Sequence, residues 1–355
     1  MRDAEAMARA LALAWQGWGR VGRNPMVGAV VLRDGAVVAE AYHSSYGGPH
    51  AEAAALAEAG GRARGGDLVV TLEPCRHHGK TPPCVDAIVA AGVRRVVFGA
   101  ADVDPQARGG AAVLKAAGVA VEGGVLEREV RAQNAAFFHR HAHPERPWVA
   151  LKLAMSLDGR IADAEGHARW ITGPAARDWV HQLRAGFEAI AVGKGTALAD
   201  DPALTVRGAI RPAAPPVRVV FDRGASLPVS ATLVRTAREV STIVLAEREG
   251  PGAAVLREAG TDVLVTSGPA DGLAQLGSRE VASVLVEGGG VLAGHLIAEG
   301  LVDRIYLLTA PILLGSGGRP AFAGVPGATL GTVRRWSVTG RHALDDDTLI
   351  VLDRP

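Results

Sequence analysis

The chain has 355 residues with a hydrophobic share of 48%, which suits two domains with a core each. The formal net charge of +1 gives no broad basic field that would attract nucleic acid, and two cysteines are too few for a disulfide scaffold. No apolar run approaches the roughly 18 residues of a membrane span, and the charged first residues lack the apolar core of a signal peptide. We therefore expect a soluble, cytoplasmic protein without a membrane partner.

The first part of the chain alternates helix and strand signals. An amphipathic helix is predicted over residues 4–16, and the turn Arg33-Asp34-Gly35 predicts a hairpin between the apolar runs Met26–Leu32 and Ala36–Ala41. Two helices with glycine stops and two buried-type strands follow, namely helix Ala51–Ala59, strand Asp67–Leu72, helix Cys84–Ala91 and strand Arg94–Gly99. This alternation indicates an α/β layer fold.

A polar stretch with two prolines, His139–Pro147, separates this part from a second alternating region. We place the domain boundary there, which gives domains 1–145 and 146–355. The three histidines at alternate positions are interpreted as part of a solvated linker, with a metal site as the alternative. Pro174 suits the first position of a helix that runs to Ala185. Strands are predicted near Trp148–Ala154, Ala189–Val192, Val217–Phe221, Thr242–Leu245, Asp262–Val265, Ser283–Val286, Arg304–Thr309 and Thr348–Leu352.

Both cysteines and one histidine stand where a zinc site is expected. His50 lies two residues before Glu52 at the start of a predicted helix, Cys75 follows a strand, and Cys84 starts the next helix. The helix starts favour thiolates, and three protein ligands leave the fourth position of zinc for a water whose pKa the metal lowers toward about 7. Glu52 is placed to carry protons between that water and a departing amine. We predict a zinc-dependent deaminase of the nucleobase type with Glu52 as its catalytic residue.

Other interpretations of this cluster stay open. A structural zinc site would need a fourth protein ligand, which His77 or His78 could supply, and such a scaffold would tolerate Glu52→Gln. A disulfide between the cysteines is disfavoured in the cytoplasm. The usual deaminase signature ends in Cys-x-x-Cys, whereas eight residues separate Cys75 from Cys84, which points to a particular branch.

Several motifs resemble the bifunctional riboflavin-biosynthesis deaminase–reductase family. In the first domain they are Asn24–Gly28, Gly47–Glu52 and the long loop Pro74–Cys84. In the second domain they are Leu151–Ala162, Trp170–Gly173, Asp200–Arg207 and Val286–Gly290. The resemblance implies a cytidine-deaminase-like three-layer α/β/α domain followed by a dihydrofolate-reductase-like α/β domain.

The resemblance also implies two consecutive reactions on small molecules. With Zn²⁺, the first domain would remove an amino group from 2,5-diamino-6-(5-phosphoribosylamino)pyrimidin-4(3H)-one. With NADPH, the second would reduce the ribosyl group of 5-amino-6-(5-phosphoribosylamino)uracil to ribityl. Related enzymes suggest a homo-oligomer, either a dimer or a tetramer. The alternative is a deaminase with a non-catalytic C-terminal binding domain. An RNA-gripping deaminase is disfavoured by the near-zero charge.

By resemblance, Asn24 and His43 would contact the base in the deaminase pocket, and Lys80 would line its mouth. The simpler alternatives are a turn element for Asn24, which precedes a proline, and a hydrogen-bonded surface histidine for His43.

The second domain has no Gly-x-Gly-x-x-Gly after a strand, so the Rossmann fingerprint is absent. Gly288-Gly289-Gly290 does follow a strand and precedes the helical stretch Val291–Ala298. One interpretation is that the backbone N–H groups of these glycines approach the pyrophosphate of a cofactor. The alternative is that the glycines form only a tight turn. The cofactor residues implied by the resemblance are Ala154, Trp170, Thr196, Asp200, Gly289, Gly290, Val291 and Leu292. Asp222, which ends a strand, is a further candidate for the cofactor ribose.

The substrate residues implied for the second domain are Lys152, Ala168, Arg184, Leu204, Arg207 and Glu287. Lys152 and Asp200 are both candidate proton donors. Arg184 and Arg207 suit the 5′-phosphate, with surface salt bridges as the alternative. The chain departs from the family pattern at three positions: Arg23 and Gly290 stand where proline is usual, and Ala168 where serine is expected.

Overall fold

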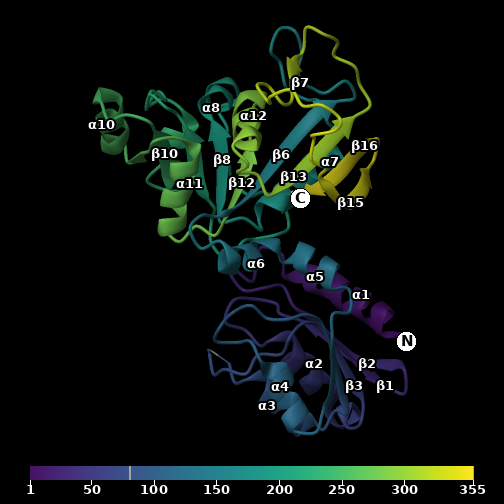
Figure 1. Ribbon diagram of the computed structural model, residues 1–355. Coiled ribbons are helices and arrows are strands. Elements are labelled where there is room, and N and C mark those ends of the chain that lie inside the picture. The colour runs from purple at the N-terminus through teal and green to yellow at the C-terminus, as the bar shows by residue number, and fades with distance from the viewer. Residues whose placement is uncertain (80, 355) are drawn as a thin grey trace. The chain divides into compact units, whose positions relative to one another are not determined.

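The structure, a computed structural model, describes residues 1–79 and 81–354. The chain divides into two compact units, Met1–Ala142 and His143–Pro355 (Figure 1). Both units are mixed α/β, as predicted. Among the described residues, no helix has the length and apolar character needed to cross a membrane.

Unit 1 is built on a five-stranded sheet in the order β2-β1-β3-β4-β5. β1 is antiparallel to β2 and β3, whereas β3, β4 and β5 are parallel. The strands are β1 (Gly28–Arg33), β2 (Ala36–Tyr42), β3 (Asp67–Leu72), β4 (Arg95–Ala100) and β5 (Ala120–Gly123). The helices are α1 (Asp3–Ala14), η1 (Trp15–Gly17), α2 (Ala51–Ala59), η2 (Gly60–Ala63), α3 (Cys84–Ala91), α4 (Gly110–Ala116), α5 (Glu127–Gln133) and α6 (Ala135–Ala142).

Alternating side chains of the strands fill two cores in unit 1, one on each face of the sheet. Val31 and Val70 face one core, which α2, α3 and α4 cover. Val30 and Val69 face the other, which α1, α5 and α6 cover. The result is the three-layer arrangement predicted for this part of the chain.

Glycines end the two helices that carry the metal-site residues. α2 ends at Gly60, and α3 ends at Gly92 in the left-handed conformation, φ 68°. The prediction of a solvated linker over His139–Pro147 is wrong for its first four residues, which form the second half of α6. The apolar side chain of Phe137 explains this, because it is buried in the core beneath α1 and anchors the helix.

Unit 2 is built on a nine-stranded sheet in the order β11-β10-β9-β8-β12-β6-β13-β16-β15. The strands from β11 to β13 are parallel, and β13, β16 and β15 are antiparallel. The strands are β6 (Trp148–Ser156), β7 (Arg160–Ala162), β8 (Ala189–Gly193), β9 (Val217–Phe221), β10 (Thr242–Ala246), β11 (Asp262–Val265), β12 (Ser283–Glu287), β13 (Arg304–Ala310), β14 (Arg319–Pro320), β15 (Ser337–Leu344) and β16 (Asp347–Asp353). β7 and β14 form a separate two-stranded ribbon.

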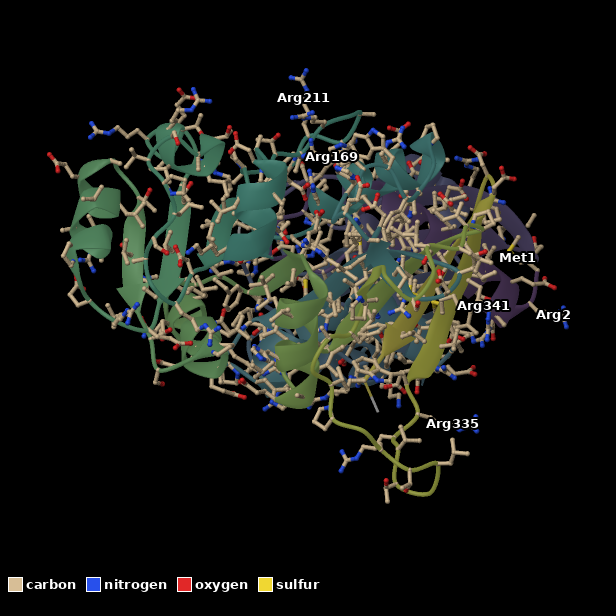
Figure 2. The ribbon with its side chains drawn as sticks, turned by 90° about the horizontal axis from the view of Figure 1, so that it is seen from above. Met1, Arg2, Arg169, Arg211, Arg335 and Arg341 are labelled. Carbon is tan, nitrogen blue, oxygen red and sulfur yellow. The ribbon has the colours of Figure 1, made fainter. Side chains whose placement is uncertain are left out.

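The helices of unit 2 cover both faces of this sheet. They are α7 (Pro174–Arg184), α8 (Lys194–Asp200), α9 (Thr232–Arg235), α10 (Pro251–Glu258), α11 (Pro269–Ser278) and α12 (Gly290–Ala298). α11 and α12 pack on one face, and α8, α9 and α10 on the other. Edge strand β15, which carries Arg341, was not predicted because its residues are mostly polar and half-exposed. The long segment before it, with Arg335, extends away from the sheet (Figure 2).

Candidate functional site

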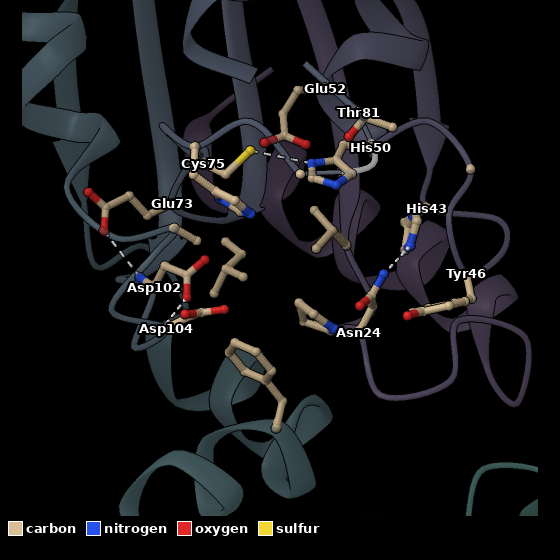
Figure 3. A pocket seen from close by; sticks show the side chains of 18 of the residues that line it. Asn24, His43, Tyr46, His50, Glu52, Glu73, Cys75, Thr81, Asp102 and Asp104 are labelled. Carbon is tan, nitrogen blue, oxygen red and sulfur yellow. Dashed lines mark hydrogen bonds between the residues drawn. The ribbon is translucent and has the colours of Figure 1, made fainter. Parts of the chain in front are cut away.

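Three potential metal ligands converge in unit 1. His50 immediately precedes α2, Cys75 lies in the loop after β3, and Cys84 is the first residue of α3. Their ligand atoms all lie within 4.8 Å of one another. Figure 3 shows two of them, the His50 ring and the Cys75 sulfur, side by side. The cysteines are free thiols rather than a disulfide. Within the described part of the chain, neither His77 nor His78 joins this group, which therefore offers three protein ligands.

The donor set fits zinc chemically. His50 Nδ1 lies 3.2 Å from Cys84 Sγ and 3.5 Å from Cys75 Sγ, and the Cys84 backbone N–H points to Cys75 Sγ at 3.5 Å. Hydrogen bonding from Cys84, together with His50, lowers the pKa of Cys75 to about 4. The neighbouring Cys75 sulfur raises the pKa of Cys84. One imidazole nitrogen and two sulfurs therefore lie close together, and a divalent cation bound among them would hold both sulfurs as thiolates.

Glu52 lies beside the three ligands, on the wall of a cavity of about 230 Å³. It is 4% exposed, and burial raises the pKa of Glu52 to about 7. A carboxyl with such a pKa can both accept and release a proton near neutral pH, which is the property a general acid–base needs. Because Glu52 is the second residue of α2, the helix that begins after His50 also positions the carboxyl.

Asn24 and His43 meet on another part of the cavity wall. The Asn24 amide nitrogen lies 3.1 Å from His43 Nε2, and His43 Nδ1 lies 3.0 Å from the Pro49 carbonyl oxygen (Figure 3). That carbonyl can only accept, so Nδ1 donates to it and Nε2 accepts from Asn24. Burial lowers the pKa of His43, which keeps this neutral form. Lys80, predicted at the cavity mouth, lies outside the described residues.

The cavity wall also includes residues that sequence reasoning missed. They are Tyr46, Glu73, Thr81, Asp102, Asp104, Phe137 and Arg140. Glu73 and Asp102 follow the ends of parallel strands β3 and β4, a position that could have revealed them. The Glu73 carboxylate accepts the backbone N–H groups of Asp102, Gly109 and Ala111, and so shapes the loop that forms this wall. Burial raises the pKa of Asp102 to about 6.

In unit 2 the predicted glycine-rich turn lies where two parallel strands end. β8 and β12 are neighbours, and each leads directly into a helix, α8 after Gly193 and α12 after Gly289. The Thr196 hydroxyl accepts the Gly289 N–H at 3.1 Å and links the two helix starts. A Cβ on Gly290 would lie 2.2 Å from the Pro320 carbonyl oxygen, so a side chain there would force the backbone of this protein to shift.

Lys152, Arg184 and Glu287 form a cluster behind that turn. Glu287 and Lys152 are register partners on β12 and β6. The Arg184 guanidinium donates from Nε and Nη2 to the two Glu287 carboxylate oxygens, and from Nη1 to the Thr205 carbonyl oxygen at 3.1 Å. Burial opposes ionisation of Glu287, but attraction to Arg184 outweighs it and lowers the pKa of Glu287. Burial lowers the pKa of Lys152.

The other residues predicted for the reductase site differ in solvent exposure. Leu204 is buried with φ 47°, Ala154 is half-buried on β6, and Leu292 lies against Gly193. Trp170 is 69% exposed, with the Arg177 guanidinium 4.6 Å from its ring centroid. Ala168, Arg207 and Val291 are also solvent-exposed. Asp200 ends α8, and its carbonyl oxygen accepts a hydrogen bond from Arg169.

Asp222 is 2% exposed, and its carboxylate accepts the backbone N–H groups of Gly224, Ser226 and Leu227. These bonds give Asp222 a role in the turn after β9. A contact with the cofactor ribose stays a prediction.

Fold and sites together define a zinc-binding base deaminase joined to a reductase, and comparison with known proteins agrees. Residues 147–350 match the RibD C-terminal domain, and residues 1–100 match the cytidine and deoxycytidylate deaminase zinc-binding region. The riboflavin biosynthesis protein RibD of Aquifex aeolicus is 41% identical over 318 residues, 89% of this chain and 88% of that protein.

Two solved structures are similar along the whole chain. RibD of Acinetobacter baumannii has a TM-score of 0.83 and 35% identity, and the match covers 99% of this chain and 98% of that one. A diaminohydroxyphosphoribosylaminopyrimidine deaminase/5-amino-6-(5-phosphoribosylamino)uracil reductase from Thermotoga maritima also has a TM-score of 0.83 and 35% identity, with 99% of both chains covered. The chain belongs to the RibD family, the bifunctional deaminase–reductases of riboflavin biosynthesis. It combines a zinc-binding deaminase domain with an NADPH-dependent reductase domain.

Proposed function

We propose that unit 1 deaminates 2,5-diamino-6-(5-phosphoribosylamino)pyrimidin-4(3H)-one. We propose further that unit 2 reduces the ribosyl group of 5-amino-6-(5-phosphoribosylamino)uracil to ribityl with NADPH. The observation that carries the proposal is the meeting of His50, Cys75 and Cys84 within 4.8 Å, beside buried Glu52, where His50, Cys75 and Glu52 line a cavity. Family membership supplies the substrates, and the cavity supplies the groups that hydrolytic deamination needs.

In unit 1, His50, Cys75 and Cys84 would hold the metal. Zinc supplies a water with a lowered pKa and a positive charge that polarises the ring. Glu52 accepts a proton from the attacking water and donates one to the departing amine, roles that its pKa of about 7 supports. Asn24 presents its amide to the base, with its orientation set by the neutral His43 ring. Lys80 is assigned to the cavity mouth by resemblance.

In unit 2, the cofactor would lie across the ends of β8 and β12. NADPH supplies the hydride. The N–H groups at the start of α12 suit its pyrophosphate, and Thr196 holds Gly289 in position for that contact. Resemblance assigns the remaining cofactor contacts to Ala154, Trp170, Asp200, Gly290, Val291, Leu292 and Asp222.

The reductase substrate would lie against the cluster at Glu287. Glu287, held ionised by Arg184, accepts hydrogen bonds from sugar hydroxyls. Lys152, whose pKa burial lowers, can release a proton more readily than an exposed lysine, which favours it over Asp200 as the proton donor. Arg207 is exposed and suits the 5′-phosphate. Ala168, Leu204 and Arg184 complete the proposed set.

We also propose that the protein is a cytoplasmic homo-oligomer that does not bind nucleic acid. Both cysteines must stay reduced to bind zinc, which favours the reducing cytoplasm. The net charge of +1 disfavours nucleic acid. An open strand edge at β15, preceded by exposed Leu330 and Val333, supports self-association. Sedimentation that gives a monomer mass at micromolar concentration would contradict the oligomer.

Incubation with the diamino substrate tests both activities, with ammonia release and NADPH absorbance followed separately. Wild type should release ammonia and then consume NADPH. The Glu52→Gln variant should retain zinc, lose ammonia release by about 10²- to 10⁴-fold, and still reduce supplied deaminated intermediate. Ammonia release without NADPH consumption, even with that intermediate, would favour a non-catalytic binding role for unit 2.

A further inference from the structure

Three cations follow neighbouring strand ends of the unit 2 sheet. Strands β10, β9, β8 and β12 are adjacent in this order and parallel, so the segments after them meet at one end of the sheet. Lys194 is the first residue of α8, directly after β8, whereas Arg223 and Arg248 come shortly after β9 and β10. Both arginines are exposed to solvent. Positive charge therefore gathers at the end of the sheet that is proposed to receive the cofactor.

Two of these cations lie around one small region of the surface, next to Gly224. The Lys194 ammonium donates to the Ser226 hydroxyl at 2.6 Å. A Cβ on Gly224 would lie 3.4 Å from the Ser226 hydroxyl oxygen and 3.7 Å from Arg248 Nη2. Within the described ranges, neither Lys194 nor Arg248 pairs with a carboxylate. Because an ammonium has three N–H donors, Lys194 can keep its bond to Ser226 and still bind an anion.

The carboxylates of the two loops do not cancel this charge. Asp222 is buried, and its carboxylate accepts four hydrogen bonds from the turn that follows it. Glu249 forms an ion pair with Arg257. Glu247 is the remaining carboxylate of the loops and is exposed, so one negative charge opposes three positive ones. The local potential is therefore positive and favours an anionic group.

The order of the strands determines which part of the cofactor would reach these cations. The proposed pyrophosphate contact is at the start of α12, and Glu287 and Lys152 lie on β12 and on β6 beside it (Figure 1). The nicotinamide has to face that cluster to pass its hydride to the substrate, so the adenosine half extends the other way, over β8 toward β9 and β10. Neighbouring strands are about 4.8 Å apart, which places both loops within reach of one nucleotide. A phosphate on the 2′-oxygen of the adenosine ribose is what distinguishes NADPH from NADH.

We propose that Lys194, Ser226 and Arg248 bind the 2′-phosphate of NADPH and thereby make unit 2 select NADPH over NADH. The guanidinium of Arg248 suits two phosphate oxygens at once, Lys194 adds a point charge, and Ser226 holds the lysine in position. Exposed Arg223 adds to the positive potential. The inference rests on the proposed reductase function, in which the cofactor lies across the ends of β8 and β12, and it adds the residues that determine cofactor specificity.

A binding experiment on the full chain, without substrate, tests the site. Calorimetric titration compares 2′,5′-ADP, which carries the 2′-phosphate, with 5′-AMP, which lacks it. Arg248→Gln and Lys194→Gln should each weaken binding of 2′,5′-ADP by about 10- to 100-fold, the effect of losing a hydrogen bond to a charged group, and should change binding of 5′-AMP by less than about twofold. Arg248→Lys should recover part of the loss, because it keeps the charge but not the bidentate geometry.

Consumption of NADPH and of NADH with supplied deaminated intermediate gives a second readout. Wild type should prefer NADPH, and Lys194→Gln/Arg248→Gln should lose most of that preference through a raised KM for NADPH. Arg257→Gln on α10 is the matched control, because that arginine is also exposed but is paired with Glu249. It should leave both the binding of 2′,5′-ADP and the preference for NADPH close to wild type.

The outcomes separate this inference from the proposed reductase function. Equal weakening of 2′,5′-ADP and 5′-AMP in the variants would overturn the inference and leave Lys194 and Arg248 as structural contacts of the loops. A wild type that binds both nucleotides equally, or that uses NADH as well as NADPH, would overturn it too. If wild type oxidises neither cofactor with the intermediate, the reductase function fails, whereas binding of 2′,5′-ADP that depends on Arg248 would still support the phosphate site.

Discussion

Unit 1 gathers its reactive groups into one enclosed cluster, whereas unit 2 spreads them along the ends of several strands. His50, Glu52, Cys75 and Cys84 come from two helix starts and one loop. The first three line a single cavity. In unit 2, the Gly289 turn, the Glu287 cluster and exposed residues such as Trp170 lie on different elements. A hydrolytic site needs its groups within reach of one water. A hydride-transfer site needs two large ligands aligned, so a longer surface serves it.

This contrast predicts that removal of the metal abolishes the deaminase activity of unit 1 and leaves the reductase activity of unit 2 unchanged. Cys75→Ala should lose zinc, and ammonia release should fall by about 10³-fold or more, because several kcal/mol of electrostatic stabilisation disappear at about 1.36 kcal/mol per tenfold. NADPH consumption with supplied deaminated intermediate should stay near the wild-type rate. Metal analysis and both assays check this. A parallel loss of NADPH consumption would break the comparison.

A second prediction concerns the buried ion pair of unit 2. Arg184 and Glu287 are only 14% and 12% exposed, so Glu287→Leu leaves an unpaired buried cation. We expect this variant to lose about 3–5 kcal/mol of unfolding free energy, and the double variant Arg184→Leu/Glu287→Leu to lose markedly less. Urea titration with hydrogen exchange read in β6 and β12 measures both. Equal losses in the single and double variants would show that the pair is not coupled.

Lowering the pH should weaken the ion pair between Arg184 and Glu287 and so lower the free energy of unfolding of unit 2. The pKa of Glu287 is lowered in the folded protein, mainly because attraction to Arg184 outweighs burial. The stabilisation is therefore complete above the ordinary carboxyl pKa of about 4.3 and is lost as the pH falls through the lowered value. The stability of wild-type unit 2 should fall with pH in this range more steeply than that of the double variant.

The close approach of α12 to β14 predicts a smaller loss of stability when Gly290 is replaced by a larger residue. Gly290→Val places a side chain 2.2 Å from the Pro320 carbonyl oxygen, so the backbone must shift. We expect a loss of about 1–3 kcal/mol in unit 2 and a raised KM for NADPH, with ammonia release unchanged. Gly195→Ala in α8 is the control, since nothing lies within 4 Å of its added Cβ. An unchanged KM for NADPH in Gly290→Val would argue against a cofactor at the start of α12.

The smallest predicted effect concerns the hydrogen bond that joins two helix starts. Thr196→Val removes the acceptor for the Gly289 N–H, worth about 1 kcal/mol, so the KM for NADPH should rise about fivefold. Thr196→Ser keeps the hydroxyl and should stay close to wild type. A similar KM in both variants would show that Thr196 acts only through packing.

The contrast between local signals and contacts made by distant segments explains which features of the fold and the site can be predicted from the sequence. The C-terminal ends of α2 and α3 follow from glycine stops, which are local signals. The metal group follows from the residue types and positions of His50, Cys75 and Cys84 at or beside predicted helix and strand ends. Asp102 follows the end of a predicted strand, but its place on the cavity wall depends on the pairing of β4 with β3, which the sequence does not specify locally. Arg140 lies in a stretch whose polar composition suggests a linker, although buried Phe137 makes it part of a helix. The bidentate bond between Arg184 and Glu287 joins residues far apart in the chain.

The position of α6 has a practical consequence for dissecting the enzyme. This helix is the last element of unit 1 and also a wall of its cavity, through Phe137 and Arg140. A truncation after α5 would keep every zinc ligand and Glu52, yet it would remove the hydrogen bonds of the Asn134 side chain to the Met26 backbone and open the cavity on one side. A metal-loaded fragment of that kind would report on zinc affinity but not on turnover, and a deaminase fragment intended for assays has to extend at least through Ala142.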